Sequence, residues 1–251
     1  MNDTTPLKRL IARVRVKPNR PTDALDGSSK GARSRTRASA GPRRLKREVR
    51  EQLIVDEAIR YFAEVGFGGD TRALAKRLGI TQPLLFRYFP TKHALIERVY
   101  QQVFVSRWNP QWEQILSDRS RPLRARLVDF YHDYARVVLT PEWVRIFLFS
   151  GLSGQHLNQR YLKFIRDHVY ARLGEELRAH CRLPDTRRKP LQELELELAR
   201  MLNEKIFYLG VRKWVYNVSV PADVGAVIDA EVTAYLEGVP RALRKLHRRG
   251  R

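Results

Sequence analysis

Apolar residues recur at three- and four-residue steps along almost the whole chain from residue 45 onward. This spacing places apolar side chains on one face of an α-helix, whereas a half-buried strand needs strict alternation, which the sequence nowhere sustains. The first helical pattern ends at Gly66, because a glycine just after the last apolar position commonly marks the end of a helix. Its apolar positions are Val49, Leu53, Ile54, Ala58, Phe62 and Val65. We therefore predict an all-α protein.

Two short helices are predicted next, over about residues 71–78 and 82–88. Asp70 or Thr71 can cap the first of them, and Thr81 can cap the second. A four-residue turn that contains a glycine joins them. Two short helices with such a turn are typical of a helix-turn-helix, whose second helix lies in the major groove of DNA.

The second short helix is apolar nearly all round, which is unusual for a helix that packs with one face. Leu85 and Phe89 lie four residues apart and can pack together against the preceding helix. On the remaining surface, glutamine can pair with adenine, apolar groups can meet a thymine methyl, and arginine can reach guanine or phosphate. These residues are Gln82, Pro83, Leu84, Phe86, Arg87 and Tyr88. Each apolar member alone fits a protein core equally well, so the DNA-binding interpretation depends on the whole block.

Residues 47–105 resemble the DNA-binding domain of the tetracycline-repressor (TetR) family. The resemblance rests on helix 53–65, the turn Gly66-Phe67, and segments 71–75, 78–83, 85–89 and 91–95, in the family's order and without a gap. It implies a three-helix DNA-binding domain, which we expect over residues 45–107. It also implies a helical domain that binds an effector and dimerises, which we expect over residues 108–251.

The resemblance further implies a set of DNA-contacting residues. Its members are Thr71, Arg72, Thr81, Gln82, Pro83, Leu84, Phe86, Arg87, Tyr88 and Lys92. Thr71 and Arg72 would meet the DNA backbone and a base, and residues 82–84 would face base edges. The two aromatic residues and Lys92 stand where the family places phosphate contacts.

Two of these positions depart from the family pattern. Leu84 replaces a small or hydroxyl-bearing residue, and Phe86 replaces a tyrosine whose hydroxyl could bond a phosphate. Arg87, at a variable position, is expected to supply a contact instead. The operator sequence therefore does not transfer from relatives to this chain.

Aromatic residues crowd the region beyond Pro110, where longer amphipathic segments are predicted over 121–139, 142–151, 157–182, 191–217 and 222–247. Core packing explains most of these aromatic residues. A minority can line an apolar cavity for the effector, since ligand pockets are mainly apolar with a few polar groups. The candidates are Trp112, Tyr131, Tyr134, Phe147, Tyr161 and Phe207.

The last two long segments each carry an apolar stripe. One comprises Leu194, Leu198, Leu202 and Leu209, and the other comprises Val224, Ile228, Val232, Leu236 and Val239. Two such helices from each subunit would form a four-helix dimer interface, as they do in relatives, whereas an intrachain hairpin would use the same stripes. A homodimer is favoured because two-fold symmetry places two recognition helices about 34 Å apart, one turn of DNA.

The chain carries 48 Lys and Arg against 27 Asp and Glu, a formal charge of +21, which favours a polyanionic partner. Residues 1–44 hold 12 Lys and Arg against 3 Asp and few apolar residues, so we expect a disordered basic arm. The arm can also attract phosphates without sequence preference. An alternative function is thus a non-specific nucleic-acid-coating protein that depends on this arm.

Other classes of protein have little support. No HExxH motif or phosphate-binding loop is present, so we expect no enzyme, catalytic residue, metal or cofactor. The lone Cys181 excludes an intrachain disulfide framework, and no stretch approaches the roughly 18 apolar residues of a membrane span. We expect a cytoplasmic, dimeric, ligand-responsive regulator, most simply a repressor, that binds a palindromic operator in double-stranded DNA and responds to a small-molecule effector.

Overall fold

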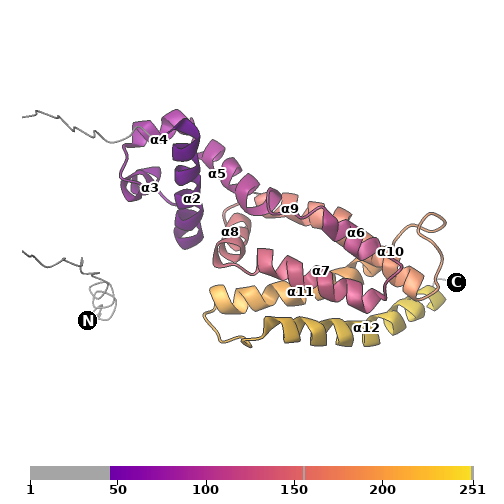
Figure 1. Cartoon of the computed structure of the whole chain (residues 1–251). Coiled ribbons are helices and arrows are strands. Elements are labelled where there is room, and N and C mark those ends of the chain that lie inside the picture. Colours follow the sequence, from indigo (N-terminus) through magenta and orange to yellow (C-terminus); the bar gives the residue numbers. More distant parts are fainter. Residues whose placement is uncertain (1–45, 155, 250–251) are drawn as a thin grey trace, which may run out of the picture. The chain divides into compact units, whose positions relative to one another are not determined.

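The computed structural model describes residues 46–154 and 156–249, and helices make up most of these residues (Figure 1). The helices are α2 (Arg47–Val65), α3 (Thr71–Arg77), α4 (Gln82–Tyr88), α5 (Lys92–Tyr100), α6 (Gln111–Ser117), α7 (Leu123–Val138), α8 (Pro141–Leu152), α9 (Leu157–Ile165), α10 (Ala171–His180), α11 (Glu193–Trp214) and α12 (Val224–Arg249). Two π-helical segments, η1 (Gln101–Val105) and η2 (Arg166–Tyr170), continue α5 and α9. The predicted all-α fold is confirmed, with a helix-turn-helix domain followed by a helical domain. The predicted basic arm lies outside the described residues.

Local chemistry sets the ends of the first helices. Gly66 follows α2 with a φ of +77°, in the region that favours glycine, and its N–H donates to the Phe62 carbonyl at 2.9 Å. The carboxylate of Asp70 then accepts a 2.9 Å hydrogen bond from the Arg72 N–H and caps α3. The two hydrogen bonds satisfy backbone groups that a helix end leaves without partners, one through a backbone N–H and one through a side chain.

A small apolar core holds the helix-turn-helix domain together. Helix α2 packs against α3 and α5, and α3 packs against α4 (Figure 1). Phe62, Leu74, Leu85 and Leu95 are at most 1% exposed. Burying each such side chain stabilises the fold by about 1.5–3 kcal/mol, so this domain has a well-defined core despite its short helices.

The C-terminal helices pack around α7 and α11. Helix α12 lies beside both of them, and α8 contacts α2, α9 and α11 (Figure 1). Most of the apolar stripe predicted for a dimer interface is covered by the chain itself. Leu202, Leu209, Ile228, Val232 and Val239 are all at most 8% exposed. These residues form the intrachain hairpin of α11 and α12.

A buried charged cluster fastens the start of α11 to the ends of two other helices. The Arg178 and Glu195 side chains are each 1% exposed, and Nη2 of Arg178 lies 2.5 Å from Oε2 of Glu195. His247 of α12 approaches the other carboxylate oxygen at 3.0 Å. Glu195 also accepts a bond from the Gln192 backbone N–H at 2.8 Å and completes a capping box for α11.

In the described ranges, no helix is both long and apolar enough to cross a membrane.

Candidate functional site

The turn between α3 and α4 is closed by its own backbone. Gly79 has a φ of +65°, and the Ile80 N–H donates to the Ala75 carbonyl at 3.0 Å. The hydroxyl of Thr81 then accepts from the Leu84 N–H at 3.3 Å and caps α4, with Pro83 in the first turn. Leu85 turns inward and is 1% exposed. The start of α4 is therefore fixed relative to α3.

Three of the predicted DNA-contacting residues form one hydrogen-bonded group, which we name the α3–α4 amide bridge. The amide nitrogen of Gln82 donates to the Thr71 hydroxyl at 2.8 Å. The amide oxygen of Gln82 accepts from Nε of Arg72 at 3.3 Å. A glutamine amide has two N–H donors and two oxygen lone pairs, so one of each remains for an adenine edge. The bridge thus orients Gln82 and leaves it able to read a base.

The other predicted residues differ in accessibility. Arg72, Pro83 and Arg87 are exposed, whereas Leu84, Phe86 and Lys92 are partly covered. Tyr88 is also half-buried, and it packs against the apolar core. Thr71 is only 8% exposed, and its hydroxyl receives the hydrogen bond from Gln82. In the absence of DNA, Thr71 therefore acts as a buried hydrogen-bond acceptor that holds the Gln82 side chain.

Charge at this end of the domain is strongly positive. Residues 70–93 contain five Lys or Arg and one Asp. Arg77, which the sequence did not single out, binds Glu57 at 2.8 Å and Glu64 at 2.5 Å and so joins α3 to α2. The hydrogen bond from Arg77 holds the pKa of the Glu64 carboxyl below its usual value. Arg72, Lys76, Arg87 and Lys92 form no ion pair with a described residue and can attract an anion such as phosphate.

The six candidate effector-binding aromatic residues form one contiguous cluster in the C-terminal helices. The Trp112 ring lies 5.5 Å from that of Tyr134, which lies 6.3 Å from Tyr131. The hydroxyls of Tyr134 and Tyr161 are 3.1 Å apart. The chain of rings then continues from Tyr161 to Phe147 at 6.1 Å and from Phe147 to Phe207 at 5.3 Å. We call these six residues the aromatic cluster.

Two buried polar atoms in this region have no hydrogen-bond partner among the described residues. They are the Tyr131 hydroxyl and the amide oxygen Oδ1 of Asn203. The amide nitrogen of Asn203 donates to the Tyr170 hydroxyl at 3.1 Å. An unpaired buried polar group is rare in a folded protein and calls for a partner such as water or a ligand.

Burial makes the phenols of the aromatic cluster still harder to ionise than a tyrosine in water. Desolvation raises the pKa of Tyr134 to about 12, and it raises the pKa values of Tyr131 and Tyr161 well above the usual range. At neutral pH these side chains therefore offer hydroxyl donors and acceptors without charge.

Three members of this region were not predicted from the sequence. Phe104 in η1 lies 5.4 Å from the Tyr161 ring and 6.4 Å from the Phe147 ring. Tyr170 closes η2, and Asn203 lies in the middle of α11. Each π-helical segment thus brings one aromatic residue to the region, and π-bulges often occur at functional sites.

Large apolar residues recur at seven-residue intervals along the outer face of α11 and at Val215, the residue that follows it. Leu194, Met201, Tyr208 and Val215 are 53%, 53%, 50% and 39% exposed. A seven-residue apolar repeat is the pattern of a helix that packs along a second helix. We call these four residues the α11 outer stripe.

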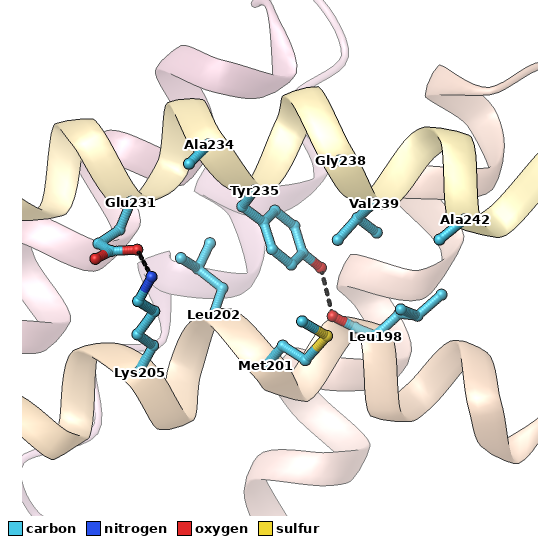
Figure 2. A pocket seen from close by; sticks show the side chains of 10 residues that line it. All are labelled: Leu198, Met201, Leu202, Lys205, Glu231, Ala234, Tyr235, Gly238, Val239 and Ala242. Carbon is cyan, nitrogen blue, oxygen red and sulfur yellow. Dashed lines mark hydrogen bonds and ion pairs between the residues drawn. The ribbon is translucent and has the colours of Figure 1, made fainter.

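A surface groove runs beside this stripe, between α11 and α12 (Figure 2). Small residues of α12, namely Ala234, Gly238 and Ala242, form one of its walls. Lys205 and Glu231 form an ion pair at 2.5 Å across one end, and the Tyr235 hydroxyl donates to the Leu198 carbonyl at 2.8 Å across the groove (Figure 2). The small side chains leave room for the side chains of a second helix.

Comparison with known proteins also identifies a DNA-binding family's sequence pattern over the helix-turn-helix segment. Residues 54–99 match the sequence model described as "Bacterial regulatory proteins, tetR family". Tetracycline repressor protein class A from transposon 1721 of Escherichia coli is 31% identical over 98 residues, which are 36% of this chain and 45% of that protein. The chain thus aligns with less than half the length of this curated relative.

Solved structures resemble the fold over most of the chain. A TetR-like transcriptional regulator from Rhodococcus sp. RHA1 has a TM-score of 0.57 and 19% identity, covering 78% of this chain and 100% of that one. A tetR-family transcriptional regulator from Streptomyces coelicolor has a TM-score of 0.54 and 17% identity, covering 79% and 85%. Residues 54–99 thus carry the sequence pattern of the tetR family of bacterial regulatory proteins, and the solved structures show that the whole fold is of the same kind.

Proposed function

We propose that this protein is a transcriptional repressor that binds a palindromic DNA operator as a homodimer and leaves it when a small effector binds. The observation that carries this proposal is the α3–α4 amide bridge, which orients Gln82 at the start of a helix within the segment that matches the family. Residues 45–107 would be the DNA-binding domain and residues 108–251 the effector-binding and dimerisation domain. The basic arm, residues 1–44, would add phosphate attraction that does not depend on sequence.

Recognition would begin at the first turn of α4, because the recognition helix of this motif presents its N-terminal residues to base edges. The free N–H and lone pair of Gln82 suit an adenine, and the exposed Pro83 and half-buried Leu84 suit a thymine methyl. Arg72 and Arg87 are exposed cations that can reach guanine or phosphate. Thr81, Phe86, Tyr88 and Lys92 would complete the contacts with the DNA backbone.

A second copy of the chain would cover the α11 outer stripe and the neighbouring groove. In a two-fold dimer the same patch meets itself, so the side chains of one stripe pack against the small residues of the other subunit. The large exposed residues Met201 and Tyr208 support this arrangement, because contiguous exposed apolar surface marks an interaction site. The dimer would hold two α4 helices one DNA turn, about 34–36 Å, apart.

The effector would bind at the aromatic cluster. The unpaired Tyr131 hydroxyl and Asn203 amide oxygen support this, because a ligand with a hydrogen-bonding group would satisfy them. Neutral phenols and apolar rings favour an uncharged, partly aromatic molecule over an ion. Side chains would have to rearrange to admit it, and that rearrangement is what can distinguish two states of the protein.

A continuous helical path leads from this cluster to the DNA-binding residues. Lys92 begins α5, η1 follows α5 directly, and Phe104 of η1 contacts Tyr161 and Phe147. A ligand that displaces Phe104 would move α5 and the helix-turn-helix with it. Coupling of about 1–3 kcal/mol between the two sites would be typical, and it requires the effector to prefer the state that binds DNA poorly.

Selection of bound duplexes from a random DNA pool, at near-physiological salt, tests the proposal. The full-length protein should enrich an inverted repeat whose half-sites lie one helical turn apart. Binding without an enriched motif, with steep salt dependence and loss on deletion of residues 1–44, would instead support the non-specific nucleic-acid-coating protein that the +21 charge also allows. Failure of the purified protein to bind any duplex would contradict both functions.

A further inference from the structure

Arg145 of α8 touches the ends of two helices that belong to different parts of the molecule. Its Nε donates to the carbonyl of Ala63, and its Nη2 donates to the carbonyl of Glu64 at 3.3 Å. Both carbonyls lie in the last turn of α2, in the helix-turn-helix domain. Its Nη1 donates to the carbonyl of Trp214 at 3.2 Å, and Trp214 is the last residue of α11.

The carbonyls that Arg145 reaches are of the kind that a helix leaves without internal partners. The last four C=O groups of an α-helix have no N–H ahead of them, and together they carry a partial negative charge. Helix α2 has no basic residue of its own in its last turn, so Arg145 supplies the positive charge from another part of the chain. One planar guanidinium presents several donors in a fixed fork and so can serve two helix ends in a defined geometry, whereas an ammonium group is a compact charge with three rotatable donors.

Neighbouring contacts hold this arrangement in place. The Arg145 guanidinium lies 5.7 Å from the centre of the Phe149 ring, one turn further along α8. A Cβ added at Gly66 would lie 2.9 Å from that ring, so the turn after α2 abuts Phe149 closely. On the other side, the indole nitrogen of Trp214 donates to the Leu139 carbonyl at 2.8 Å and fixes the end of α11.

Helix α11 also carries the outer stripe that would meet the second subunit. A group that joins the end of α11 to the end of α2 therefore joins the dimer surface to the DNA-reading domain without passing through α5 or the aromatic cluster. We infer that Arg145 is a positioning residue that sets the distance and orientation of the two DNA-reading domains in the dimer. This inference rests on the proposed function, since it concerns binding to two half-sites at once.

The experiment compares Arg145→Met with the wild-type protein on three DNA duplexes. They are the selected inverted repeat, the same repeat with one or two base pairs inserted between its half-sites, and a single half-site. Arg145→Met should lose affinity for the selected repeat by about tenfold, within the usual range for coupled sites. Affinity for the single half-site should stay within about twofold, because the base-reading residues are untouched. The ratio of affinities between native and lengthened repeats should therefore fall.

Two further variants separate positioning from charge and from folding. Arg187→Met removes one positive charge from a side chain that is 91% exposed, and it should leave the spacing ratio unchanged. Arg145→Lys keeps the positive charge but loses the planar arrangement of guanidinium donors. Its ratio of affinities for the native and lengthened repeats should therefore lie between those of the wild-type protein and Arg145→Met. If Arg145→Met does not fold as a dimer by circular dichroism and sedimentation, the lysine variant carries the test. An unchanged spacing ratio in a folded Arg145 variant would overturn the inference.

Hydrogen exchange gives a measurement that does not need an operator. Arg145→Met should accelerate exchange of the Gly66 amide, which bonds the Phe62 carbonyl, and of the Val215 and Tyr216 amides, which bond the Val211 carbonyl. Faster exchange at both helix ends would support the connection that Arg145 makes between α2 and α11, whatever the protein does on DNA. If the wild-type protein then selected no inverted repeat, only the proposed function would be contradicted. No change at either end would overturn the link whatever the DNA results.

Discussion

The side-chain amide of Gln82 in α4 donates a 2.8 Å hydrogen bond to the hydroxyl of Thr71, which lies eleven residues earlier at the start of α3. Thr71 is only 8% exposed, so this bond anchors α4 from its inner side. Gln82 therefore has a structural partner as well as a proposed base partner. Substitutions at the two positions should consequently have different effects on DNA binding.

Gln82→Ala should relax base preference at one position of each half-site. Losing a bidentate contact with a base removes about 1–3 kcal/mol of discrimination. Repeating the DNA selection with the variant would show the loss as one degenerate position with the rest of the motif intact. Gln159→Ala, at an exposed glutamine of α9, is the control and should keep the wild-type motif. An unchanged motif for Gln82→Ala would rule out Gln82 as a base-reading residue.

Thr71→Val should weaken binding without changing which bases are contacted. The substitution keeps the buried shape but removes the acceptor for Gln82, so the amide loses one fixed orientation. A net loss of about 1 kcal/mol, the usual value for one hydrogen bond, corresponds to a dissociation constant roughly fivefold higher. A titration with the selected duplex measures it, and wild-type affinity for Thr71→Val would show that the bridge has no part in DNA binding.

Glu195→Gln should strongly destabilise the fold. Arg178 and Glu195 are each 1% exposed, and removing one charge of such a pair leaves the other buried without compensation, at a cost of about 3–5 kcal/mol. Urea unfolding at neutral pH measures this cost. Glu193→Gln, two residues earlier in α11, is the matched control: its side chain is 80% exposed, and breaking its pair with Arg166 should change stability by at most about 1 kcal/mol. Equal effects of the two variants would contradict the importance of burial.

The same carboxylate predicts how stability depends on pH. Desolvation raises the Glu195 pKa, but hydrogen bonds from Arg178, the Gln192 backbone and His247 outweigh it and lower the pKa to about 2. Since the folded pKa lies below the unfolded value of about 4.3, the stabilisation is present above pH 4.3 and is lost as pH falls toward 2. Urea midpoints across this range should fall less steeply for Glu195→Gln than for the wild-type protein.

Local signals in the sequence were sufficient to predict the helix-turn-helix. Helix α4 has the predicted bounds, because Thr81 caps it through a bond to the nearby Leu84 N–H. Helix α6 was not predicted, and its first residue follows Pro110, which makes no side-chain capping bond. Signals confined to a few neighbouring residues are therefore the ones that the sequence reveals.

Relationships between distant residues could not be predicted in the same way. The bond between Gln82 and Thr71 depends on how α3 and α4 cross, and the contacts of Arg145 end on backbone carbonyls, which every residue possesses. The apolar stripes of α11 and α12 were visible, but periodicity does not tell which neighbour covers a stripe. The hairpin buries Leu202 and Val232 and leaves Met201 and Tyr208 exposed, an outcome that depends on how α11 and α12 pack.

Met201→Glu should weaken the proposed dimer. Met201 is 53% exposed in the isolated chain, so the substitution should leave the subunit folded. In a two-fold interface the new carboxylate appears twice, and close like charges cost several kcal/mol. Sedimentation equilibrium should show a dimer dissociation constant at least about tenfold higher. Leu152→Glu, at an 84% exposed residue in the last turn of α8, should leave the dimer intact. A dimer of unchanged strength in Met201→Glu would place the interface elsewhere.

Tyr131→Phe should stabilise the ligand-free protein. The Tyr131 hydroxyl is fully buried and has no partner among the described residues, and such a group costs about 1–3 kcal/mol. Removing it should raise the free energy of unfolding in urea by about 1 kcal/mol, because the phenyl ring still fills the same space. Tyr134→Phe is the matched control, since that hydroxyl is paired with Tyr161 at 3.1 Å and its loss should destabilise the protein by a similar amount. If Tyr131→Phe instead lowers stability as much as Tyr134→Phe does, then a bound water already satisfies Tyr131, and the argument for an effector contact at this hydroxyl is lost.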